Sequence, residues 1–129
     1  TPNISGAIGL GTAIEFVNSI GLGRIKQHEE ALLSYATKRV SEIPGLSVIG
    51  TSPSKANILS FLIDEIHPAD VASLLDQQGV AVRSGHHCCQ PLMERFKIRG
   101  TLRASFSVYN NASDVDVLVA ALKKAKEFF

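Results

Sequence analysis

The chain has 129 residues, 45% hydrophobic and 19% charged, so it is the size of one ordinary domain and can bury a core. Thirteen basic residues against twelve acidic ones give a net charge of +1, which favours neither nucleic acid nor an anionic membrane as partner. No apolar run approaches the roughly 18 residues of a membrane span, and no signal peptide is recognisable. Because the first residue is Thr1, we expect a processed product or a piece of a longer protein.

The N-terminal half predicts two helices and two strands. Residues 5–20 form a helix rich in Gly and Ala, which is unstable unless close packing compensates, so we expect it to lie against another domain or subunit. Gly21-Leu22-Gly23 breaks this helix, and residues 24–43 form a long amphipathic one. Residues 46–49 predict a short strand, and the nearly all-apolar residues 57–63 predict a central strand.

The C-terminal half alternates helices and strands. A helix begins at Pro68 and ends near Gly79, and residues 80–83 form a strand. Residues 90–96 give a short helix, and the period-two pattern of residues 102–109 predicts a half-buried strand.

The last helix completes the predicted fold. Ser113 is its expected N-cap, with Asp116 three residues on as a capping box. Its expected inner face comprises Val115, Leu118, Val119, Leu122 and Phe129. Together the elements predict an α/β sandwich, a small sheet of about four strands with helices packed against it.

The segment from Arg83 to Pro91 is the candidate site for chemistry. Cys88 lies just ahead of a helix that Pro91 can open, and the pKa of a thiol falls near a helix N-terminus or a cation. Arg83, His86 and His87 can add positive charge around it. The alternative is a buried structural cysteine.

The two cysteines, Cys88 and Cys89, are adjacent, and a disulfide between neighbours is strained. We therefore expect free thiols and a reducing, intracellular setting. His86 to Cys89 offer zinc-type ligands, but four contiguous residues cannot converge on one ion, and His28 and His67 lack ligand-like partners. No metal site is predicted.

Arg103 lies on the side of its strand opposite Leu102 and Ala104, so it points away from the core. A strand-borne arginine is suited to bidentate capture of a carboxylate. A solvated surface arginine remains the alternative.

Arg-Ser-Gly-His-His-Cys at residues 83–88 followed by Gln-Pro-Leu, then Arg103-Ala104-Ser105 and Tyr109-Asn110, resemble the Suf-type cysteine desulfurases. These are group II NifS-like enzymes, which include selenocysteine lyases, in the class V pyridoxal-phosphate (PLP) aminotransferase fold. Thr1-Pro2-Asn3 and the stretch after it also match the family, so the resemblance covers the whole chain.

The resemblance implies a role for three residues. Cys88 matches the catalytic cysteine, whose thiolate attacks the sulfur of L-cysteine, keeps it as a persulfide and releases L-alanine, with PLP as electron sink. Arg103 matches the arginine that holds the substrate carboxylate. Thr1 matches a threonine that reaches the cofactor phosphate of the partner subunit in the family homodimer.

The departures from the family pattern also carry information. The histidine-lysine motif that binds PLP and the large cofactor domain are missing, so the resemblance implies a connecting helix at residues 1–22 and a C-terminal small domain of a fold-type I PLP enzyme at residues 23–129. The isolated chain is then expected to be inactive. Cys89, where the family more often has alanine, is interpreted as a tolerated small residue.

The resemblance further implies that the parent enzyme supplies sulfur for iron–sulfur cluster assembly through a SufE- or SufU-like acceptor. It would work in the cytoplasm, or in an organelle of a eukaryote. The alternatives are a selenocysteine lyase, a stand-alone module that binds a sulfur acceptor, and a class V relative acting on another amino acid.

Overall fold

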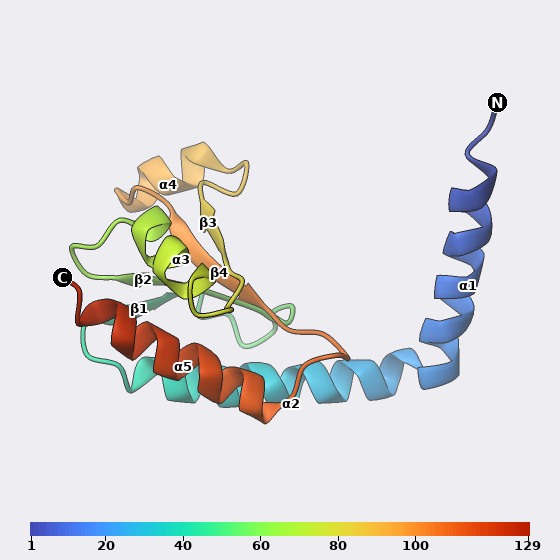
Figure 1. The fold of residues 1–129 in the computed structure, drawn as a ribbon, viewed down its shortest axis with the longest axis horizontal. Coiled ribbons are helices and arrows are strands. Elements are labelled where there is room, and N and C mark those ends of the chain that lie inside the picture. Colours follow the sequence, from blue (N-terminus) through green and yellow to red (C-terminus); the bar gives the residue numbers. More distant parts are fainter.

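The computed structural model describes all residues from Thr1 to Phe129. Five helices and four strands follow one another in the order α1 (Ile4–Ile20), α2 (Leu22–Ser41), β1 (Leu46–Ile49), β2 (Ile58–Ile63), α3 (Pro68–Asp76), β3 (Arg83–Gly85), α4 (Gln90–Phe96), β4 (Thr101–Ser105) and α5 (Ala112–Lys126). The predicted small four-stranded sheet with helices against it is confirmed (Figure 1). No helix combines the length and the apolar character that crossing a membrane requires.

The sheet has the strand order β1-β2-β4-β3, and every neighbouring pair is antiparallel. Side chains alternate between its two faces, as the pleat requires. One face presents buried residues to the helices: Leu59, Phe61 and Ile63 from β2, and Leu102 and Ala104 from β4. The opposite face carries half-buried side chains, including Ser60 and Arg103, which are register partners. The sheet is therefore covered by helices on one face only.

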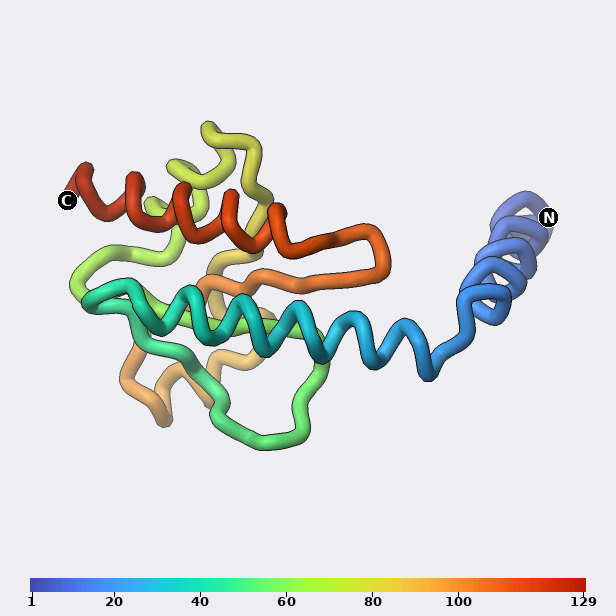
Figure 2. Tube along the Cα trace, turned by 90° about the horizontal axis from the view of Figure 1, so that it is seen from below, coloured from blue at the N-terminus to red at the C-terminus, as the bar shows by residue number.

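Helices α2, α3 and α5 form the covering layer, and α2 and α5 run side by side (Figures 1 and 2). The predicted stripe of α2 comprises Ile25, Leu32, Ala36, Val40 and Ile43, of which Ile25 is only half-buried and the others are buried, Ile43 just beyond the helix end. The predicted inner face of α5 is also buried, except Phe129, which is 67% exposed because it lies beyond the end of the helix. These side chains join those of the sheet in one hydrophobic core.

Helix α1 buries none of its residues and points away from the rest of the chain (Figures 1 and 2). Gly21, with φ of 91°, separates it from α2, whereas Leu22 and Gly23 already belong to α2 rather than to a break. The ring of Phe16 stacks on Tyr109 with centroids 6.5 Å apart. The helix predicted to need a packing partner thus exposes its apolar residues to solvent: Ile4, Ile8, Leu10, Ile14 and Phe16.

The structure corrects two predicted strands. The strand expected at residues 80–83 begins at Arg83 instead, because Val80 and Val82 pack on the core without entering the ladder of β3 and β4. The strand expected to reach residue 109 ends at Ser105, and a turn around Tyr109 follows.

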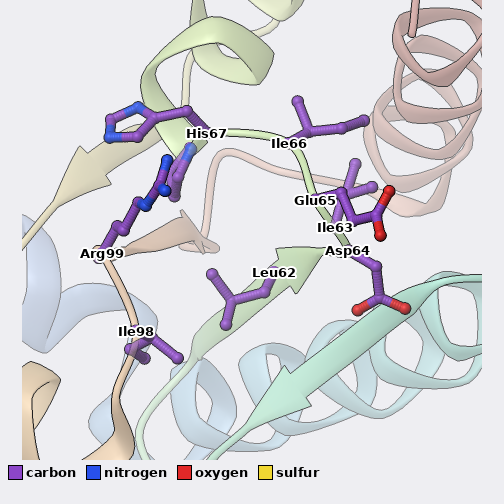
Figure 3. Close-up of a pocket in the computed structure, with 10 residues that line it drawn as sticks. Leu62, Ile63, Asp64, Glu65, Ile66, His67, Ile98 and Arg99 are labelled. Carbon is purple, nitrogen blue, oxygen red and sulfur yellow. The ribbon is translucent and has the colours of Figure 1, made fainter.

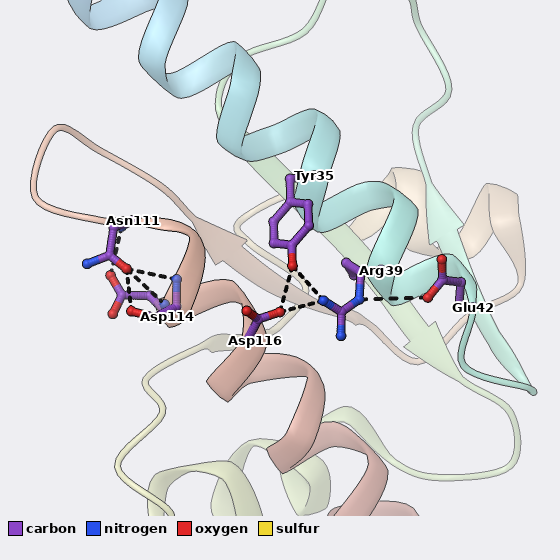
Figure 4. A network of polar contacts seen from close by, with 7 residues as sticks. Tyr35, Arg39, Glu42, Asn111, Asp114 and Asp116 are labelled. Carbon is purple, nitrogen blue, oxygen red and sulfur yellow. Dashed lines mark hydrogen bonds and ion pairs between the residues drawn. The ribbon is translucent and has the colours of Figure 1, made fainter.

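The predicted capping box of the last helix is displaced by two residues. Asn111 is the N-cap, and its side chain accepts from the Asp114 backbone N–H while the Asp114 carboxylate accepts from the Asn111 backbone N–H. Asp116 has another role, because it accepts hydrogen bonds from Tyr35 at 2.7 Å and from Arg39 at 2.5 Å (Figure 4). This network links α5 to α2 across their exposed edge.

Candidate functional site

The segment around Cys88 forms a tight turn between β3 and α4. His87 and Cys88 both have left-handed backbones, with φ of 54° and 60°. That conformation costs an L-residue roughly 1–2 kcal/mol, so two in succession require support from their surroundings. The Cys89 backbone N–H donates to the His86 carbonyl at 2.9 Å and closes the turn. Sharp backbone geometry therefore determines where the Cys88 thiol points.

Both cysteines are free and exposed. The alternative of a buried structural cysteine is therefore wrong for this structure. The Cα atoms of adjacent residues lie approximately 3.8 Å apart, which is less than the usual Cα separation in a disulfide. A disulfide between Cys88 and Cys89 would therefore be strained. The exposed Cys88 thiol can be reached by a substrate or by another protein.

His87 supports the turn through its side chain. Its Nε2 lies 3.1 Å from the carbonyl oxygen of Thr101 and 2.9 Å from the Thr101 hydroxyl. Burial lowers the pKa of His87, and the positive charges of Arg103 and Arg83 lower it further. His87 thus favours the neutral form, contrary to the expectation that it adds positive charge next to Cys88.

Arg103 lies in β4 between two neighbouring strands, opposite Ser60 on one side and Arg83 on the other. Leu102 and Ala104 face the core, so the predicted outward orientation of Arg103 agrees with the burial pattern. Its side chain is half-buried, and its Nε is buried without a hydrogen-bond partner. Like charges directly opposite each other on a sheet repel, so an anion bound at Arg103 and Arg83 would relieve this repulsion.

His87 joins the turn that carries Cys88 to β4, the strand of Arg103. His87 bonds Thr101, which precedes Arg103 by two residues and so projects from the same face of β4. An exposed thiol can attack a small substrate, and an arginine whose Nε lacks a partner can hold a carboxylate. His86 and Arg83 are exposed near this turn.

Thr1 is not part of this arrangement. It is exposed at the free end of α1, far from the sheet (Figure 1). The other two histidines have local roles: His28 bonds the Asn110 carbonyl, and His67 caps α3 by accepting from the Ala69 backbone N–H. No group of three or more His, Cys, Asp or Glu residues is arranged to hold a metal ion.

A cleft of about 480 Å³ lies at the junction of two loops near the end of β2 (Figure 3). Arg99 and His67 lie at one side of it, and Asp64 and Glu65 at the other. It is lined by Leu62, Ile63, Asp64, Glu65, Ile66, His67, Pro68, Ile98, Arg99 and Gly100. Neither Cys88 nor Arg103 lines it, so this cleft is separate from the candidate site.

Comparison with known proteins places the chain in a family. The family model of the class-V aminotransferases matches residues 1–118. The chain belongs to the class-V aminotransferase family. Probable cysteine desulfurases from Halalkalibacterium halodurans and Streptomyces coelicolor are 50% and 46% identical to it. All of this chain is covered in both alignments, but only 32% and 31% of the relatives.

Solved structures agree with this class-V assignment. A cysteine desulfurase from Thermococcus onnurineus superposes with a TM-score of 0.92 and 40% identity, covering 98% of this chain and 32% of that one. The cysteine desulfurase CsdA from Escherichia coli superposes with a TM-score of 0.91 and 36% identity, covering all of this chain and 32% of that one. The predicted family resemblance is confirmed, and the chain spans about a third of the length of its relatives.

Class-V aminotransferases are generally PLP-dependent. The residues of this chain do not form a PLP site by themselves, because a lysine that carries the cofactor is needed in an enclosed pocket. Lys126 is half-buried and donates to the Pro44 carbonyl. The remaining lysines are exposed: Lys26, Lys38, Lys55, Lys97, Lys123 and Lys124.

Sequence reasoning missed Thr101. It is the only buried polar residue, with 2% exposure, and it anchors His87. A threonine directly before an expected strand carries no distinctive signal in the sequence. Its register opposite Gly85, which brings it under the turn, arises only from the pairing of β3 with β4.

Proposed function

We propose that the chain is the C-terminal part of a cysteine desulfurase that converts L-cysteine to L-alanine and keeps the sulfur as a persulfide on Cys88. The Cys88 thiolate would attack the substrate sulfur, so that an S–S bond forms and the substrate C–S bond breaks. The electron pair stays on the substrate carbon, which takes up a proton to give alanine. The exposed thiol on its left-handed turn carries this proposal, together with a relative at 50% identity.

Arg103 is proposed to bind the substrate carboxylate. Its half-buried position, the unpaired Nε and the facing Arg83 support this role, because each favours an anion at this place. His86 and Arg83 would add positive charge at the edge of the site. Neither residue needs to contact the reacting sulfur.

PLP is the proposed cofactor, and it would be held mainly by the part of the protein outside this chain. Residues 1–22 would connect that part to the small domain at residues 23–129. The exposed apolar side of α1 supports this division, since such a surface is unfavourable in water. Thr1, distant from Cys88, would reach the cofactor phosphate of the second subunit in a homodimer.

A dedicated sulfur acceptor is the proposed partner. The turn between β3 and α4 is short, and its closing hydrogen bond from Cys89 to His86 restricts how far Cys88 can travel. A persulfide on Cys88 would therefore need an acceptor that docks at the site, such as a SufE- or SufU-like protein. The sulfur would then serve iron–sulfur cluster assembly in the cytoplasm or in an organelle.

The test uses the full-length protein that contains this chain. With L-cysteine, it should release alanine, and mass spectrometry should find the sulfur adduct on the peptide with Cys88. Cys88→Ala should abolish both, whereas the matched control Cys89→Ala should retain alanine release within about twofold. Undiminished alanine release by Cys88→Ala would overturn the proposal. Selenocysteine, offered in parallel, separates a desulfurase from a selenocysteine lyase.

A second experiment addresses the isolated chain. Mixed with L-cysteine and PLP, the 129 residues should release no alanine at enzymatic rates, because no lysine occupies an enclosed pocket. Turnover by the isolated chain would contradict the proposed division of the site between this chain and the rest of the protein.

A further inference from the structure

We propose that His87 is a positioning residue, which holds the Cys88 thiol in place by donating a hydrogen bond from Nε2 to Thr101. The clamp is defined here as the His87 side chain and its two contacts with Thr101. It joins the turn that carries Cys88 to β4, fourteen residues further along the chain.

The contacts determine which ring nitrogen carries the proton. A backbone carbonyl can only accept, so its 3.1 Å contact with Nε2 is a hydrogen bond when Nε2 carries the proton, and we assign the proton of the neutral ring to Nε2 on this ground. Nδ1 then holds a lone pair in the neutral ring. This atom is buried and has no hydrogen-bond partner.

Thr101 is a rigid anchor for the clamp. It is 2% exposed, belongs to β4 and pairs with Gly85 of β3. The clamp therefore ties residue 87 to the same strand pair from which the turn emerges. Between these fixed points the chain has little freedom, and this holds the unfavourable left-handed backbones of His87 and Cys88.

The surroundings of the ring disfavour a second proton. A proton on Nδ1 would create a buried N–H without an acceptor. Burial lowers the pKa of the ring most, and the hydrogen bond to the Thr101 carbonyl raises it. The positive groups Arg103 from β4, Arg83 from β3 and His86 from the turn itself lower it further, so the net shift is downward. Protonation consequently costs more free energy in the clamp than in water and reduces the stability of the clamp.

Acidification should therefore loosen the turn. Once His87 leaves Thr101, the left-handed residues relax and the Cys89 N–H is less firmly held against the His86 carbonyl. The part that the clamp plays in persulfide formation rests on the function proposed above. The clamp itself does not, and the following test measures only the clamp.

The test follows the Cys89 backbone amide by hydrogen exchange in the full-length protein that contains this chain, with rates corrected for the intrinsic effect of pH. Loss of one hydrogen bond should reduce its protection about five- to tenfold. His87→Gln keeps a donor near the position of Nε2 but cannot be protonated, whereas His87→Phe keeps the ring shape without a donor. His28→Phe is the matched control, because it removes another bond from a histidine Nε2 to a carbonyl.

We expect the wild-type chain to lose protection at Cys89 as the pH falls below the usual histidine range. His87→Gln should keep its protection over the same range, and His87→Phe should lack it throughout. His28→Phe should behave like the wild type. The proposal would be overturned if His87→Gln and His87→Phe showed equal protection of the Cys89 amide, or if the wild-type protection did not depend on pH.

A second measurement needs no variant. Nitrogen-15 NMR of the wild-type imidazole rings should show His87 as the neutral tautomer with the proton on Nε2. A proton on Nδ1 in the neutral ring would overturn the proposal even if the variants fail to fold.

Discussion

Gly100 is the position at which one added methyl group should do most damage near the site. Its φ of 139° is rarely adopted by other residues, and a Cβ built there would lie 2.9 Å from both the carbonyl carbon and the oxygen of Gly85. Both contacts are with backbone, so no flexible side chain can move aside. Gly85 is two residues before His87, and the clash therefore acts directly on the turn that carries Cys88.

The expected cost of Gly100→Ala combines two effects. The unfavourable backbone conformation contributes about 1–3 kcal/mol, and forcing atoms into a packed region adds about 1–3 kcal/mol. The sum of about 2–6 kcal/mol is a large share of the 5–15 kcal/mol that typically stabilises a domain. Gly79→Ala is the matched control, since Gly79 also has positive φ, at 75°, but nothing lies within 4 Å of its Cβ. Gly79→Ala should lose only about 1–2 kcal/mol of unfolding free energy.

Urea denaturation followed by circular dichroism measures both variants, with the slope of the transition checked for a change in the unfolded state. Gly100→Ala should unfold at clearly lower urea than Gly79→Ala. If the two variants lose the same free energy of unfolding, the close approach of Gly100 to Gly85 does not contribute, and the reasoning is refuted.

Three further predictions concern the core, the site and pH. Phe61→Ala removes a fully buried ring and should cost about 3–5 kcal/mol of unfolding free energy, whereas Leu62→Ala, on the half-buried face, should cost less; urea denaturation compares them. In the full-length protein, Arg103→Lys should lower kcat/KM for L-cysteine about ten- to a hundredfold, because lysine cannot bind a carboxylate bidentately; an unchanged value would exclude Arg103 from substrate binding. Because the pKa of His87 is lowered on folding, the unfolded chain binds a proton that the folded chain does not, so stability should fall as the pH drops below about 6.5; His87→Gln should lose less over the same range.

The limits of two short elements and the core-facing stripe of α2 were predictable from local sequence. The residue limits of β1 and α4 agree with the prediction, and the buried stripe of α2 lies where its periodicity places it. The strand before the turn was misplaced because Val80 and Val82 are apolar for packing rather than for pairing. Apolar character shows that a residue is covered but does not show whether its backbone enters a ladder.

The capping box shows a different limit. Ser113 with Asp116 has the same spacing as Asn111 with Asp114, and both are acceptable caps. The choice depends on a tertiary contact, because Asp116 is needed by Tyr35 and Arg39 of α2. Local preference alone could not decide between two registers of similar strength.

The candidate site was predictable in its residue types but not in its electrostatics. Cys88 and Arg103 could be selected from a motif and from strand alternation, since both signals are local. The lowered pKa of His87 depends on burial and on the charge of Arg103, which lies near the ring only through the pairing of β3 with β4. The sequence offered His87 as a possible positive charge beside Cys88, whereas in the fold its lowered pKa favours the neutral form. The pairing of β3 with β4 thus brings Arg83 and Arg103 near His87, and their charges lower its pKa further.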